Sequence, residues 1–232
     1  MGTDDEKTDS VPDLETIFQE IAKEVYLAYA VNEMLNLIGN HADQINSHGF
    51  GNFFGQLQSI LTNQFILSMT KVFEKPRNFA LYSIPQALKE MEGREISDCA
   101  YLLGGLEACG LPRAKFEHLS NKELAARAIR IASTKQPHST IKKLKALRDK
   151  KVAHSEAIPL DEIEKPIWEE AEQALEFAMK FIAIGGSSYF NIGFGDQNYN
   201  FCYEYDAKSL SANLSRLLRT AGIAKDNESS ED

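Results

Sequence analysis

The stretch Ile141–Glu156, IKKLKALRDKKVAHSE, carries the most informative pattern in the chain. Six of the ten residues from Lys142 to Lys151 are Lys or Arg, whereas the whole chain has a formal net charge of −9. On a helix, at about 100° per residue, the apolar residues of this stretch share one broad arc: Ile141, Leu144, Leu147 and Val152. The stretch therefore predicts a helix that buries one side and presents a local basic cluster, a pattern that favours contact with phosphate.

Arg148 and His154 depart from this division of the helix into two sides. Both fall within or at the edges of the apolar arc, about 120° apart by the same geometry. An unpaired charge on a buried face costs several kcal/mol, so these side chains need a partner on another element, another subunit or a ligand. Lys151 shares the arc, although its long stem can carry the ammonium group outward to solvent.

Arg148 and Asp149, followed by four residues and then His154, resemble the motif of HEPN domains (higher eukaryote and prokaryote nucleotide-binding). The surrounding phrase LKALRDKKVAHSE is similar to the abortive-infection branch of that superfamily. A second phrase, LTNQFILSMTKVFE at residues 61–74, resembles the second helix of the same branch. The resemblance implies a supporting carboxylate at Glu74, for which the alternative is a helix-end carboxylate in solvent.

This pair of residues suits the cleavage of RNA without a metal. The 2′-hydroxyl of RNA attacks the neighbouring phosphorus when a base removes its proton and a cation stabilises the developing charge. His154 suits the first role because its pKa lies near neutrality, and Arg148 suits the second because its guanidinium binds phosphate oxygens bidentately. Asp149 could orient either residue. The flanking phosphates would be held by three lysines: Lys145, Lys150 and Lys151.

The resemblance also implies a homodimer, because HEPN ribonucleases pair two protomers so that two Arg and two His line one cleft. The expected activity is that of a phage-defence toxin that cleaves single-stranded RNA, with no cofactor. The alternative is a non-catalytic HEPN module that binds a nucleotide or a protein, such as an antitoxin or another defence protein. In a purely structural interpretation, Arg148 pairs with an acidic side chain on one of the two long helices and His154 caps the helix terminus.

Composition limits the class of protein further. The length of 232 residues, with 43% hydrophobic and 25% charged residues, is typical of a globular protein of one domain, with or without an appendage. The chain has no apolar run of about 18 residues and no signal-peptide pattern at its start, so we expect a cytoplasmic protein without a membrane span. Its histidines and cysteines are dispersed, so no metal motif is found.

Helical periodicity dominates the first 184 residues and predicts an all-α, HEPN-like bundle with long N-terminal helices. The first long helix is expected from Ser10 or Asp13 to Gly39, and the second from Asn52 to Glu74. The motif helix should have its N-cap at Ser139 or Thr140. Other helices are expected over four further ranges: Ile84–Met91, Ser97–Ala108, a capping-box helix from Ser120 to about Ser133, and Leu160–Ile184, which Gly185 and Gly186 should end.

A change in composition marks a small C-terminal extension. Ser187–Tyr205 is rich in Tyr and Phe around a turn-like centre, which predicts a β-hairpin or, alternatively, an aromatic loop draped over the bundle. A last helix should run from Asp206 to about Ala221. The expected division is therefore a disordered start (1–10), a helical domain (11–184), the extension (185–222) and a disordered acidic tail (223–232).

Overall fold

The protein is an all-α bundle, as its sequence predicts. The computed structural model describes residues 12–76, 80–153, 166–190 and 193–224, excluding the side chains of 151–153. Throughout these ranges the regular structure is helical, and the one β-pairing is an isolated antiparallel bridge between Gly195 and Phe201. None of the helices in the described ranges is long and apolar enough to cross a membrane.

Two long antiparallel helices form the N-terminal part, and both were expected. Helix α1 spans Leu14–Asn40 and helix α3 spans Gly51–Val72, with a short helix α2, Ala42–Ser47, in the segment between them. Asp13 caps α1, since its Oδ1 accepts a hydrogen bond of 2.9 Å from the backbone N–H of Thr16. This bond lowers the pKa of the Asp13 carboxyl group.

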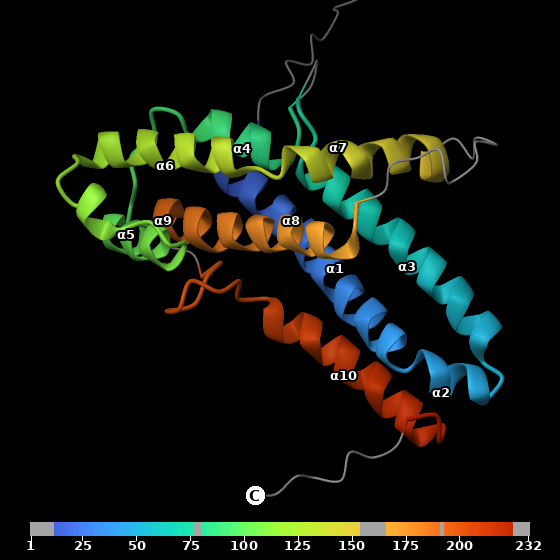
Figure 1. Ribbon diagram of the computed structural model, residues 1–232. Coiled ribbons are helices and arrows are strands. Elements are labelled where there is room, and N and C mark those ends of the chain that lie inside the picture. The colour runs from blue at the N-terminus through green and yellow to red at the C-terminus, as the bar shows by residue number, and fades with distance from the viewer. Residues whose placement is uncertain (1–11, 77–79, 154–165, 191–192, 225–232) are drawn as a thin grey trace, which may run out of the picture.

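Helix α1 is the central element of the bundle. It packs against α3 along one side and contacts α4 (Ile84–Met91), α8 (Trp168–Lys180) and α10 (Glu204–Thr220) on its other sides (Figure 1). Its buried positions recur at helical spacing, and most of them are fully shielded from solvent: Leu14, Ile17, Phe18, Ile21, Val25 and Ala28. The core of the bundle therefore follows α1.

The remaining helices pack mainly against elements other than α1. Helix α5 spans Cys99–Ala108, a 3₁₀ turn covers Arg113–Lys115, and helix α6 spans Asn121–Lys135. The predicted capping box opens α6, because Ser120 and Glu123 each bond the backbone N–H of the other. Helix α7, His138–Leu147, follows α6 almost end to end in Figure 1.

The predicted helix stop at Gly185 and Gly186 is wrong. The chain continues from α8 through a π-helical segment, Phe181–Gly186, into helix α9, Ser187–Phe190. Both glycines are needed for close packing instead. A Cβ atom on Gly186 would lie 2.4 Å from the ring of Phe194, and one on Gly185 would lie 3.1 Å from Phe18.

The predicted hairpin is also wrong, and the alternative, an aromatic loop, describes the segment better. Only the Gly195–Phe201 bridge pairs, within a turn in which the Asp196 side chain accepts from the backbone N–H groups of Asn198 and Asn200. Phe194 and Phe201 are 3% and 2% exposed, so the aromatic side chains fill the bundle rather than face across a ladder. The predicted last helix is present as α10.

Candidate functional site

The motif helix has the predicted apolar side but not the predicted regular geometry. Ile141, Leu144 and Leu147 of α7 are buried, as expected. The helix begins at His138, ahead of the expected caps, and at Arg148 it changes into a π-helical segment, η2, Arg148–Ala153. The regular α-helical geometry assumed for this stretch therefore ends at Leu147.

Arg148 lies at this change of helix type, and two carboxylates hold it. Its Nη1 donates to Glu74 Oε2 at 2.6 Å, and its Nε and Nη2 lie 2.8 and 2.7 Å from Asp149 Oδ1. The Arg148 side chain is 25% exposed. Arg148, which the sequence placed on the apolar arc, therefore has the acidic partners that a charge in this position needs.

Glu74 reaches Arg148 from the end of the second long helix. It follows Phe73, the C-cap of α3, whose ring is 2% exposed and lies 6.0 Å from that of Phe177 on α8. This packing fixes the backbone beside Glu74. Its carboxylate is 30% exposed and also lies 3.6 Å from Lys145 Nζ, so it is not a free helix-end group in solvent. Its role as a supporting residue stays a prediction.

The four ionic groups of this cluster, Glu74, Lys145, Arg148 and Asp149, have charges that cancel. Lys145 Nζ also donates to the Phe73 carbonyl at 3.1 Å, and burial is the main cause that lowers the pKa of Lys145. Burial opposes the charge of Arg148 as well, but its hydrogen bonds to Glu74 and Asp149 outweigh that effect and raise its pKa. Arg148 is therefore a fixed cation in a locally neutral cluster.

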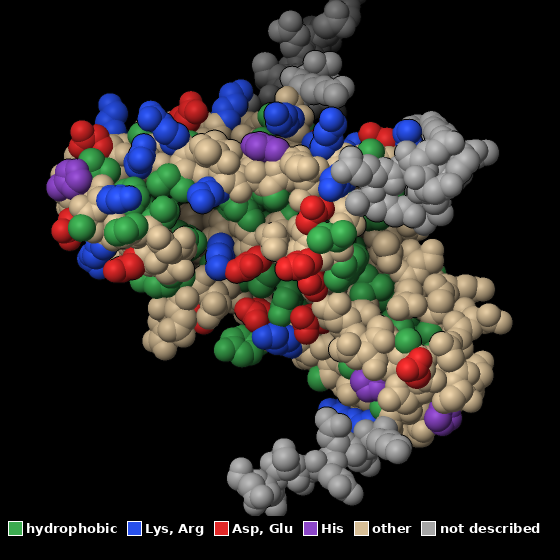
Figure 2. Space-filling view, in the orientation of Figure 1, with side chains coloured by type: hydrophobic (Ala, Val, Ile, Leu, Met, Phe, Trp, Pro, Cys, Tyr) green, Lys and Arg blue, Asp and Glu red, His purple; other side chains and the backbone are tan. Residues whose placement is uncertain are grey.

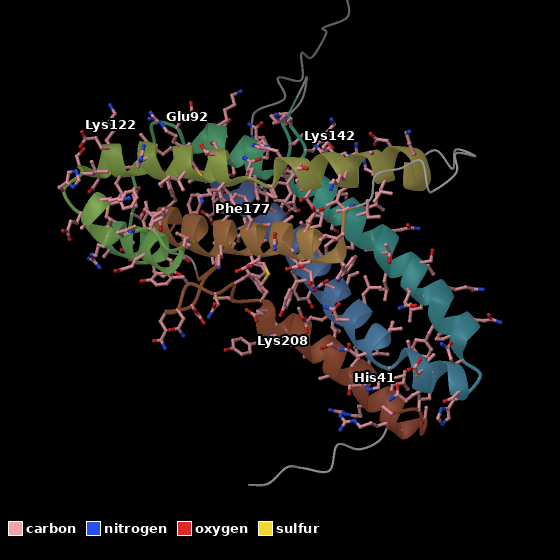
Figure 3. All side chains as sticks on the ribbon, viewed as in Figure 1. His41, Glu92, Lys122, Lys142, Phe177 and Lys208 are labelled. Carbon is pink, nitrogen blue, oxygen red and sulfur yellow. The ribbon has the colours of Figure 1, made fainter. Side chains whose placement is uncertain are left out.

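The remaining cations of the stretch differ in what they contact. Lys143 lies 3.3 Å from Glu170 on α8. Lys142, labelled in Figure 3, is exposed and Lys150 is half-buried, and neither has an acidic partner within the described ranges. Blue side chains follow the α6–α7 edge of the molecule in Figure 2, so the surface beside the cluster is basic although the chain is acidic.

His154 lies outside the described residues, as does the side chain of Lys151. The structure therefore brings together Arg148, Asp149 and Glu74, with Lys145 beside them. No group of His, Cys, Asp and Glu side chains that could hold a metal ion occurs among the residues that the structure describes.

The arrangement leaves Arg148 able to bind an anion. A guanidinium has five N–H groups, and one each on Nε, Nη1 and Nη2 is used by the two carboxylates. One N–H therefore remains on each Nη nitrogen. Each of these N–H groups can donate to a phosphate oxygen.

Sequence reasoning missed two parts of this site. The Phe73 carbonyl that anchors Lys145 could not be found, because it depends on how α3 and α7 pack. The π-helical turn gave no signal either, since periodicity analysis assumes one residue spacing throughout.

The all-α bundle, in which the Arg-bearing helix α7 packs on the long helix α3, is consistent with the HEPN class of protein. The chain belongs to the HEPN_AbiU2 family (AbiU2), a HEPN-type family associated with abortive infection, and the family model matches residues 12–200. No curated protein and no solved structure matches the chain. The match continues past residue 184 to residue 200.

Proposed function

We propose that the protein is a metal-independent endoribonuclease of the phage-defence type, which cleaves single-stranded RNA at a site containing Arg148 and His154. Membership of an abortive-infection family supports the biological setting. The geometry of Arg148 supports the chemistry, and the RNA substrate is the nucleic acid whose own 2′-hydroxyl can act as the nucleophile.

In the proposed reaction, His154 accepts the proton of the 2′-hydroxyl as that oxygen attacks phosphorus. The bond from phosphorus to the 5′-oxygen breaks, and the 5′-oxygen takes up a proton, which leaves a 2′,3′-cyclic phosphate and a 5′-hydroxyl. Arg148 stabilises the charge on the phosphoryl oxygens, and Asp149 orients Arg148. Three lysines, Lys145, Lys150 and Lys151, are assigned to the flanking phosphates.

One observation carries this proposal: Arg148 is held by two carboxylates and keeps one N–H on each Nη nitrogen. A guanidinium that is already held in place needs little reorganisation when charge develops in the transition state, and such preorganised donors typically supply a large share of catalysis. A solvated arginine on a helix face would lack this property.

Two protomers are assigned to the active form, as the resemblance to HEPN ribonucleases implies. One imidazole has to accept a proton and another group has to supply one to the leaving oxygen, so two copies of His154 in one cleft would divide the acid and base roles. A protein that cleaves RNA in its own cell also needs control, and a neutralising partner such as an antitoxin fits that need.

A second candidate function has an observation in its favour. Because the charges of Glu74, Lys145, Arg148 and Asp149 cancel, the cluster is also what a purely structural ion network would look like. The protein would then be a HEPN module that binds a nucleotide or a protein without cleaving RNA.

Incubation of the purified protein with labelled single-stranded RNA in EDTA tests the proposal. Arg148→Ala should lower the cleavage rate by about 100- to 1000-fold, and His154→Ala by about 100- to 10,000-fold. Binding of RNA or nucleotide by the wild type without cleavage would favour the second candidate.

Matched controls separate catalysis from folding. Arg127→Ala on α6 and His138→Ala at the start of α7 remove the same side-chain types from exposed positions, so both should cleave like the wild type. Circular dichroism should show equal helix content in all four variants. Equal cleavage by Arg148→Ala and Arg127→Ala would show that the site assignment is wrong.

A further inference from the structure

The segment that contains most of α2 and nearly all of α3 differs from the rest of the chain in its charge. No Asp, Glu, Lys or Arg occurs in the 27 residues from Gln44 to Thr70, although charged residues make up 25% of the chain. Surface helices normally carry charge on their solvent side. In Figure 2 the lower limb of α3 accordingly shows almost no blue or red atoms.

The first half of α3 also exposes large apolar side chains. Phe53 is 63% exposed and Ile60 is 65% exposed, with Leu57 half-buried between them. The three are spaced by four and then three residues, the spacing of a seam between two helices. Phe53 and Ile60 lie off the core face of α3, which includes Phe54, Leu61 and Phe65, whereas Leu57 packs partly against that core. We refer to Phe53, Leu57 and Ile60 as the α3 seam.

We propose that the α3 seam is a self-association surface, which packs against the same seam of a second copy of the chain. A two-fold axis near Leu57 would run the two α3 helices antiparallel and set Phe53 of each copy against Ile60 of the other, so the contact is self-complementary. Each copy buries two large side chains that are now mostly in solvent, which is a favourable exchange.

The charge of the protein favours a second copy as the occupant. Two chains that each carry a net charge of −9 repel one another, and this repulsion is smallest where their contacting surfaces have no charged groups. Depletion of charge together with exposed Phe is typical of the centre of a protein interface. Nucleic acid would need cations, which this stretch lacks.

This contact is separate from the site that contains Arg148. Glu74, which contacts Arg148, follows Ile60 by 14 residues, which corresponds to roughly 21 Å along a helix. Antiparallel pairing at the seam would therefore direct the two Arg148 residues away from each other. The seam adds a contact to the one that the proposed nuclease requires and does not replace it.

Ile60→Lys tests the proposal, with Leu217→Lys as its matched control. Leu217 is 61% exposed on α10, so both variants place a charge at an equally exposed apolar position. Sedimentation velocity and light scattering over a range of concentrations should show that Ile60→Lys weakens association by at least about tenfold, because a lysine would be desolvated in the seam. Leu217→Lys should associate like the wild type.

Association of Ile60→Lys that matches the wild type at every concentration would overturn the proposal. So would binding of the wild type, but not of Ile60→Lys, to phosphatidylcholine vesicles without self-association, since the seam would then contact lipid. RNA cleavage by Ile60→Lys should equal that of the wild type. Loss of both cleavage and association would identify the seam with the catalytic contact and would refute a separate one.

Discussion

Replacing Glu74 with Gln should loosen Arg148 without changing the volume of the side chain beside it. The variant removes the charge from the 2.6 Å contact to Arg148 Nη1 and from the 3.6 Å contact to Lys145 Nζ. A charge pair at about 4 Å is worth roughly 4 kcal/mol at an effective dielectric constant of about 20. The side chains of Arg148 and Glu74 are 25% and 30% exposed, so screening and lost side-chain entropy reduce the net value to about 1 kcal/mol.

Urea denaturation should therefore show that Glu74→Gln lowers the free energy of unfolding by about 1 kcal/mol, and the Tm should fall by about 2–4 °C. A double-mutant cycle with Arg148→Ala isolates the pair, and its coupling energy should be about 1 kcal/mol. Glu176→Gln is the control, because Glu176 is 62% exposed in its pair with Lys180, and it should change stability by less than about 0.5 kcal/mol. If the Glu74–Arg148 coupling is zero, Glu74 does not hold Arg148 in solution. If the coupling is present, RNA cleavage by Glu74→Gln should be slower by at least about tenfold, since Arg148 would no longer be preoriented.

Three other outcomes follow from the packing and the caps. Gly186→Ala should destabilise the protein, because its Cβ would lie 2.4 Å from the ring of Phe194. Gly55→Ala, whose Cβ would meet nothing within 4 Å, should stabilise the protein by up to about 1 kcal/mol. Thermal unfolding measures both changes, and equal shifts in Tm would contradict the close contact at Gly186. The pKa of Asp13 is lowered by its cap bond to Thr16, so its contribution is fully present above the usual value of 3.8 and is lost as pH falls through the lower folded value. Asp13→Asn keeps a capping side chain without the charge. The difference in stability between this variant and the wild type should therefore shrink below pH 3.8 in an acid titration followed by circular dichroism. A difference that stays constant with pH would contradict the role of the Asp13 charge in the cap.

Local signals in the sequence were sufficient for most helices. The N-cap at Asp13, the capping box at Ser120 and the limits of Ile84–Met91 all depend on residues within one turn of each other, and the structure has them as predicted. The same kind of signal failed at Gly185 and Gly186. There the glycines serve contacts with Phe18 and Phe194, which are distant in the sequence, and the helix continues through them.

The candidate site could be predicted only in part for the same reason. The position of Arg148 on an apolar arc indicated that it needs a partner, and the resemblance to the abortive-infection branch pointed to Glu74. The contact itself joins residues 74 positions apart and depends on the packing of α7 against α3. The α-helix changes into a π-helical segment at Arg148, and no periodicity in the sequence predicts this change.

The most direct measurement of the central claim is the chemical identity of the RNA ends that the wild-type protein produces in EDTA. Attack by the 2′-hydroxyl, with Arg148 and His154 in the proposed roles, predicts fragments that end in 2′,3′-cyclic phosphate and begin with a 5′-hydroxyl. Mass spectrometry of the fragments distinguishes these ends from others. Fragments with 3′-hydroxyl and 5′-phosphate ends, or no fragments at all from a folded protein over a broad set of RNAs, would contradict it.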